Sequence, residues 1–116
     1  MSRLTPGTVT DASALSLALD PLPSDQVVDG SPAAGFVELG TIGDVEVGVW
    51  EHTAGVSTDV ESDEVFVVLS GSATVTFDDP ALPPVELRAG SVGRLATGMR
   101  TTWTVHERLR KVYFAG

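Results

Sequence analysis

The chain contains no cysteine and only one lysine, Lys111, among its 116 residues. Without cysteine there is no disulfide framework, thiolate metal site or thiol nucleophile. A reducing, cytoplasmic location is therefore the expected one. Histidine is almost as scarce, because His52 and His106 are the only two imidazoles, which is too few for a three-histidine metal site.

Long apolar segments are also missing, although apolar residues make up 42% of the chain. No run approaches the roughly 20 residues that a membrane helix needs. Residues 14–19 form a short apolar stretch between Asp11 and Asp20, without the basic flank and small-residue cleavage site of a signal peptide. We therefore expect neither a membrane segment nor a secretory signal.

Basic residues are absent between Arg3 and Arg88, whereas all but one of the 16 acidic residues lie in that span. The formal net charge is −9. Such a field repels phosphate backbones, so no nucleic-acid partner is expected. An acidic surface of this kind ordinarily serves solubility, and it does not by itself indicate a function.

The chain divides into two regions that we expect to form one domain. Residues 1–33 contain four prolines, and the alternating leucines of residues 15–19 allow one short strand there. Later β-prone segments lie at residues 45–50, 65–69, 73–77, 85–87, 91–95, 101–105 and 109–115, with a turn at 70–72 and a proline-rich loop at 78–84. Short strands at this spacing predict an all-β sandwich or barrel.

A more specific pattern lies within these segments. Glu64 and Gly71 are separated by six residues, and Gly90 and Gly98 by seven. Together with residues 48–51, 63–66, 102–107 and 110–113, they resemble the two motifs of the cupin superfamily, and most closely the small cupins related to (S)-ureidoglycine aminohydrolase and the ethanolamine-utilisation cupins. The resemblance covers about residues 35–115. It implies a double-stranded β-helix, a jelly-roll-type barrel at residues 34–116, with residues 1–33 as an N-terminal arm.

The cupin pattern also implies four metal-ligand positions, which this chain fills poorly. Only Glu64 keeps a ligand side chain, while the three histidine positions hold Thr58, Val60 and Thr101. A longer spacing before the glutamate selects Ser57 and Asp59 instead, still without an imidazole. Divalent transition ions need several converging nitrogen or oxygen donors. We therefore expect no bound metal and no other cofactor.

A candidate pocket follows from strand parity, because residues two apart in a strand share a face. If the chain runs straight through residues 58–66, its alternate side chains point together, and residues 101 and 103 join them from another strand. One acid, two hydroxyls and two aromatic rings make the mixed wall of a small-molecule site. The predicted ligand-binding residues are Thr58, Val60, Glu64, Phe66, Thr101 and Trp103. The competing possibility is that Phe66 and Trp103 fill the barrel and leave no cavity.

For two residues, Lys111 and His106, the sequence allows more than one role. Lys111 shares a face with Tyr113, and it could neutralise Glu64, bind an anionic ligand or lie on the surface. His106 either lies on the surface or has a functional role, since it matches a Val-His-Glu that recurs in the family it resembles.

The leading functional hypothesis is a cupin that holds a small polar molecule in its barrel without a full metal site, rather than an enzyme. One alternative is a metal-dependent enzyme of nitrogen-compound metabolism similar to (S)-ureidoglycine aminohydrolase, whose chemistry needs an open metal position. Another is a structural or regulatory partner of a second protein. The resemblance further implies a homodimer. Because the leucines of the proline-broken segment 1–33 need burial, we expect this segment to contribute an arm to the partner subunit. No catalytic residue is assigned.

Overall fold

The computed structural model describes residues 3–116, so Met1 and Ser2 of the expected arm lie outside the described residues. The described chain consists of strands joined by turns and irregular segments and contains no helix, which confirms the all-β prediction. Over these residues, no helix has the length and apolarity to cross a membrane.

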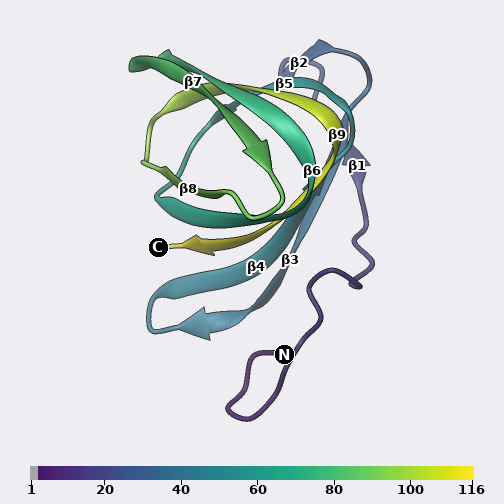
Figure 1. The fold of residues 1–116 in the computed structure, drawn as a ribbon, viewed down its shortest axis with the longest axis vertical. Helices are drawn as coiled ribbons and strands as arrows, with labels where there is room; N and C mark the ends of the chain where they lie inside the picture. The colour runs from purple at the N-terminus through teal and green to yellow at the C-terminus, as the bar shows by residue number, and fades with distance from the viewer. Residues whose placement is uncertain (1–2) are drawn as a thin grey trace.

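Antiparallel pairing joins all the strands into one curled sheet (Figure 1). β9 lies at its centre, with β4 and then β5 along one edge and β6 along the other. β3 pairs with β4, β2 with β5, and both β7 and β8 with β6. The strands are β1 (Asp20–Pro21), β2 (Val27–Asp29), β3 (Ala33–Ile42), β4 (Val45–His52), β5 (Gly55–Val60), β6 (Glu64–Asp79), β7 (Ala81–Arg88), β8 (Val92–Leu95) and β9 (Arg100–Ala115).

Alternation along β9 determines what the barrel encloses. From Thr101 to Tyr113, most odd-numbered residues are buried, and the residues between them are more exposed. Directly opposed residues of antiparallel strands share a face. The inner face of β9 is therefore continued by Phe66 opposite Tyr113 and by Val75 opposite Trp103. These residues form the hydrophobic core together with Val68, Ala73, Leu87, Leu95, Val105 and Leu109.

β6 and β9 are each a single strand of 16 residues, where the sequence predicted two shorter ones. The predicted turn at residues 70–72 is wrong, because the β6–β9 register shifts there and the strand continues. Gly71 has φ +89°, and a Cβ on it would lie 2.0 Å from the carbonyl oxygen of Arg108. The glycine therefore marks a bulge where two strand backbones approach closely, and the chain does not reverse.

Two other local predictions are also wrong. The proline-rich loop expected at residues 78–84 is largely strand, since β7 begins at Ala81 and includes Pro83 and Pro84. β7 pairs only with β6, and an edge strand tolerates prolines because one side needs no ladder hydrogen bonds. Residues 15–19 form no strand, and the short strands that precede β3 are β1 and β2.

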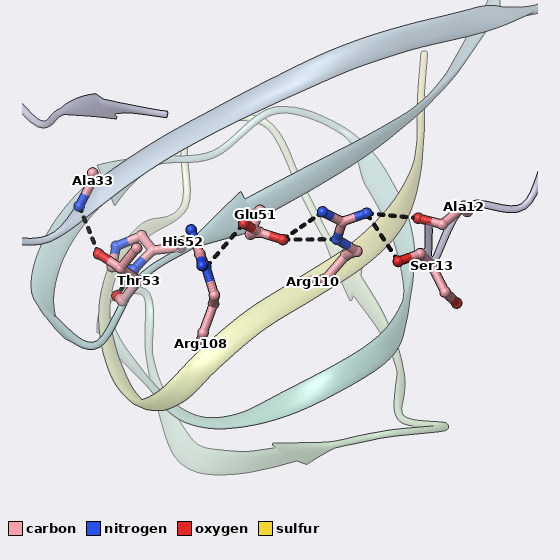
Figure 2. Close-up of polar contacts among 8 residues, drawn as sticks. All are labelled: Ala12, Ser13, Ala33, Glu51, His52, Thr53, Arg108 and Arg110. Carbon is pink, nitrogen blue, oxygen red and sulfur yellow. Dashed lines mark hydrogen bonds and ion pairs between the residues drawn. The ribbon is translucent and has the colours of Figure 1, made fainter. Parts of the chain in front are cut away.

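The N-terminal arm lies against the outer face of its own barrel (Figure 2). Arg110 donates from Nη1 to the carbonyl oxygens of Ala12 and Ser13, at 2.9 and 3.4 Å. Its guanidinium also pairs with Glu51 at 2.7 Å. Farther along the arm, a Cβ on Gly35 would lie 2.1 Å from the carbonyl oxygen of Ala18. The arm is thus fixed to β3, β4 and β9 of the same chain.

We predict that Gly71→Ala lowers the free energy of unfolding by about 3 kcal/mol or more, because a methyl group adds a backbone clash to the cost of positive φ. Gly90→Ala is the matched control, since Gly90 has φ +93° with nothing within 4 Å of its Cβ position. It should lose only about 1–2 kcal/mol. Urea denaturation measures both values, and equal losses would contradict the close approach.

Candidate functional site

A cavity of about 370 Å³ opens in the barrel among β3, β4, β5, β9 and the start of β6. This volume suits a small organic molecule. Its wall combines aromatic rings with an unusual set of charges. The rings belong to Phe36, Trp50, Trp103 and Tyr113, and the charged groups belong to Glu46, Asp59, Glu61, Glu64 and Lys111.

The ammonium of Lys111 lies at the inner wall of this cavity. Its Nζ is 2.7 Å from Oε2 of Glu64, and the Lys111 side chain is only 6% exposed. Three rings surround the same nitrogen, with centroids 4.6 Å away for Trp50, 4.6 Å for Phe66 and 4.8 Å for Trp103. Aromatic faces attract cations through their quadrupoles. Of the three roles considered, Lys111 therefore neutralises Glu64, and its expected surface alternative is wrong.

Glu61 is a site residue that the sequence did not single out. It is 7% exposed, and its Oε2 accepts hydrogen bonds from Thr101 Oγ1 at 2.6 Å and Trp103 Nε1 at 2.9 Å. Both donors are neutral, so the carboxylate is solvated by the protein without being charge-balanced. No sequence pattern singled it out, because Glu61 lies outside the predicted strands and its two donors are far away along the chain.

The six predicted ligand-binding residues are only partly brought together. Glu64 and Trp103 line the cavity from the inner face, and Phe66 lies behind Lys111. Thr101 is buried and its hydroxyl is used by Glu61. Thr58 and Val60 reach the cavity but are exposed. Cavity space remains beside Trp103, so the aromatic rings do not close the barrel.

The cross-strand register explains why Thr58 and Val60 differ from the rest. Ser57 lies opposite Trp103, and Asp59 lies opposite Thr101, so Ser57 and Asp59 occupy the inner face of β5. The chain bends between β5 and β6, and parity counted back from Glu64 is lost at that bend. The structure therefore follows the longer spacing of the cupin motif, which places Ser57 and Asp59 at the two histidine positions before Glu64. Ligand binding by the six residues stays a prediction.

The donors at the expected metal positions do not fit a metal ion. The Glu64 carboxylate is engaged by an ammonium, the Thr101 hydroxyl donates to Glu61, and the Ser57 hydroxyl is hydrogen-bonded to His52. Asp59 is then the one remaining donor of the longer spacing, and Val60 of the shorter spacing offers no donor. Within the part of the chain that the structure describes, no three His, Cys, Asp or Glu side chains are arranged to hold a metal. His106 is exposed and lies outside the cavity, with its Nε2 2.9 Å from Thr74 Oγ1.

Three groups of the wall, Asp59, Tyr113 and His52, have shifted pKa values, and burial lowers that of His52. Although Asp59 is exposed as a residue, desolvation of its carboxyl and the nearby charge of Glu61 raise its pKa to about 6, with a smaller contribution from Glu64. Burial and a hydrogen bond from its hydroxyl to Glu46 raise the pKa of Tyr113. Tyr113 is therefore a hydrogen-bond donor at neutral pH, whereas Asp59 changes charge slightly below it.

Comparison with known proteins identifies the fold. The family model of the EutQ-like cupin domain matches residues 39–113. EutQ of Clostridium difficile is similar in structure, with a TM-score of 0.64 and 18% identity over 83% of this chain and 75% of that one. The ethanolamine utilization protein Q of Salmonella typhimurium gives a TM-score of 0.60 and 21% identity over 72% of this chain and 68% of that one.

A protein of unknown function from Pseudomonas syringae, of the DUF861 family, gives a TM-score of 0.76 and 19% identity over 94% of this chain and 47% of that one. No curated protein matches the sequence. At these identities the structural likeness establishes the fold alone, and it confirms the predicted cupin barrel of jelly-roll type. The relation to (S)-ureidoglycine aminohydrolase is not shown by these matches.

We predict that the Lys111–Glu64 pair behaves as a coupled unit in a double-mutant cycle. Glu64→Gln and Lys111→Met should each destabilise the fold by about 3 kcal/mol, because each leaves a buried charge without its partner. The double variant should lie within about 1 kcal/mol of the parent, since no unpaired charge remains. Urea denaturation of the four proteins provides the measurement.

The control for that cycle is the exposed pair of Arg94 and Asp63, whose nitrogen and oxygen are 3.5 Å apart. Arg94→Gln should cost less than about 1 kcal/mol. Additive losses at Lys111 and Glu64 would show that the two groups are not coupled.

Proposed function

The chain belongs to the EutQ-like cupin family, and from this premise we propose that it binds a small polar organic molecule carrying a positive charge, without a full metal site. The observation that carries the proposal is the charge balance of the cavity wall. Four carboxylates, those of Glu46, Asp59, Glu61 and Glu64, line it with a single ammonium. A cationic guest would reduce this excess of negative charge.

The protein satisfies these carboxylates mostly with neutral donors. Glu46 accepts from the Tyr113 hydroxyl, and Glu61 accepts from a threonine hydroxyl and an indole N–H. Within residues 3–116, Lys111 forms an ion pair with Glu64 only. Hydrogen bonds from neutral groups hold a carboxylate in place but do not cancel its charge, which stays available to attract a cation.

The aromatic rings favour the same class of ligand. Trp50 and Trp103 both line the cavity, with ring centroids 5.7 Å apart. The Lys111 ammonium already lies over both rings, so they are oriented to accept a positive charge. Indole is the strongest cation–π partner among the side chains. The alkyl part of an organic ammonium ion would pack on the same surfaces.

Two of the similar structures are of proteins named for ethanolamine utilization. Ethanolamine is a primary ammonium ion at neutral pH, with one hydroxyl and two methylene groups. It therefore combines the charge and the polarity that the wall favours, and it is the first molecule to test.

We also propose that two copies of the chain form a homodimer through the outer face of β6, β8 and β9. Val65 lies opposite Phe114, and Val67 lies opposite both Val112 and Val92. This apolar outer band includes Val92, which is 68% exposed. The arm lies on the β3–β4 side of the barrel, so the band is the apolar outer surface that it leaves open.

We predict that ethanolamine changes the tryptophan fluorescence in a saturable way, because both tryptophans of the chain line the cavity. Neutral ethylene glycol and anionic glycolate, which are similar in size, should bind at least about tenfold more weakly. Glu61→Gln should weaken binding by about three- to tenfold, since one uncompensated charge is removed. Asp44→Asn, in the exposed turn between β3 and β4, is the control for net charge and should change little.

The same titration has a defined pH dependence. Asp59, with a pKa of about 6, is largely protonated at pH 5 and largely ionised at pH 7.5. The affinity for ethanolamine should therefore rise between these pH values, and Asp59→Asn should remove most of that rise. Equal affinity for the cation, the neutral molecule and the anion would refute the proposed ligand class.

For the dimer, light scattering at micromolar concentration should give about twice the 12.1 kDa of one chain. Val92→Glu should shift the protein toward the monomer, because a charge would be buried in the interface. Val28→Glu, at an exposed position of β2, is the matched control and should leave the mass unchanged. A monomeric parent protein would remove the dimer proposal.

A further inference from the structure

A serine and a histidine form a hydrogen-bonded pair on the wall of the cavity. His52 is the last residue of β4, and Ser57 lies in β5 across a short connection. His52 Nε2 is 2.8 Å from Ser57 Oγ, and both residues line the cavity although they are only 1% and 5% exposed. Neither takes part in the charge balance that supports ligand binding.

The second ring nitrogen fixes the protonation of this pair. His52 Nδ1 is 2.6 Å from the carbonyl oxygen of Thr53, which can only accept a hydrogen bond, so Nδ1 carries the proton. Figure 2 shows His52 beside Thr53 at the end of β4. In the neutral ring, Nε2 then has a free lone pair and accepts the hydroxyl proton of Ser57. This is the arrangement of a serine with its general base.

The surroundings keep the imidazole neutral. Burial of the ring lowers the pKa of His52, and the positive charge of Lys111 lowers it further, partly opposed by the Thr53 carbonyl. The ring of Trp50 lies 5.4 Å from the imidazole and restricts its orientation. His52 is therefore available as a base at neutral pH.

We propose that Ser57 is a nucleophile that His52 activates as general base. Ser57 takes an acyl group from a small carboxylic ester that enters the cavity. Ser57 Oγ forms a bond to the acyl carbon while its proton passes to His52 Nε2. The acyl–alkoxy bond then breaks, and the proton moves from His52 to the departing alcohol. Water, deprotonated by His52, next attacks the acyl-serine, which releases the carboxylic acid and restores Ser57.

Lys111 is the one lysine or arginine among the residues that line this cavity. Its ammonium lines the same cavity, and its field already acts on His52. The ammonium donates one hydrogen bond to Glu64, and an ammonium has three donors. It would stabilise the negative charge that develops on the carbonyl oxygen when Ser57 attacks.

Other hydroxyls of the chain provide internal comparisons. Ser62 also lines the cavity, but within residues 3–116 no hydrogen bond joins it to an imidazole. Thr74 contacts His106, but this pair is exposed on the outer surface, where Thr74 donates to Glu86 at 2.7 Å. Among the hydroxyl residues that the structure describes, Ser57 alone combines a histidine partner with access to the cavity.

The test is covalent labelling with methanesulfonyl fluoride, a serine reagent small enough for the cavity, followed by intact-mass analysis and peptide mapping. The expected result is one adduct, on Ser57. The Ser57→Ala variant should lose this adduct and Ser62→Ala should keep it. His52→Gln should slow the labelling by about 100-fold or more, because the general base is removed. Absence of an adduct, or equal labelling of Ser57 and Ser62, would overturn the proposal.

A second measurement needs no substitution at the buried histidine. The labelling rate of the parent protein should rise with pH and reach its plateau with a midpoint below 6.5, the ordinary pKa of histidine. A rate that rises tenfold per pH unit through pH 8 would show an unassisted hydroxyl and refute the role of His52. Ethanolamine binding is measured separately by fluorescence, so the failure of either proposal leaves the other one standing.

Discussion

Burial of the Lys111 ammonium is the constraint on which the rest of the site depends. A charge removed from water needs both an ion partner and polarisable neighbours, or the fold loses several kcal/mol. Here the partners come from three strands: Trp50 from β4, Glu64 and Phe66 from β6, and Trp103 from β9. Because Lys111 is paired with Glu64, the other carboxylates of the wall have no equivalent cation, and their negative charge defines the character of the cavity.

β9, the strand that contains Lys111, also holds the N-terminal arm through residues on its opposite face. Arg110 precedes Lys111 and points to the opposite face, where it pairs with Glu51 and binds the carbonyl groups of residues 12 and 13. Val49 lies on that outer face and is completely buried, which requires a covering segment. Adjacent cations on β9 therefore have separate roles, one inside the barrel and one that fastens the arm to it.

The sequence predicted the parts of this structure that depend on local periodicity. Alternation located β4 and parts of β6, β7, β8 and β9, but not β2, β3 or β5. The glycine spacing and the cupin resemblance gave the barrel and placed Glu64 and Trp103 beside the cavity. Gly71 was misread as a turn, because a glycine with positive φ fits a turn and a bulge equally well until the facing strand is known. The inward orientation of Ser57 and Asp59 is set by the β5–β9 register. The role of Glu61 is set by hydrogen-bond donors that lie 40 and 42 residues away in the sequence. Such long-range contacts leave no local pattern.

A fixed ammonium and a metal ion give a barrel different chemical capacities. An ammonium can donate hydrogen bonds and stabilise an anion, but it cannot accept the lone pair of a water molecule as a metal does. In a barrel whose cation is Lys111, a nucleophile must therefore be activated by a base with a free lone pair. Neutral His52 meets that requirement, and its Nδ1 proton is fixed by a backbone carbonyl that does not titrate. Asp59 titrates near pH 6 on the same strand as Ser57, so the charge that attracts a cation and the base that activates the serine are both present at neutral pH.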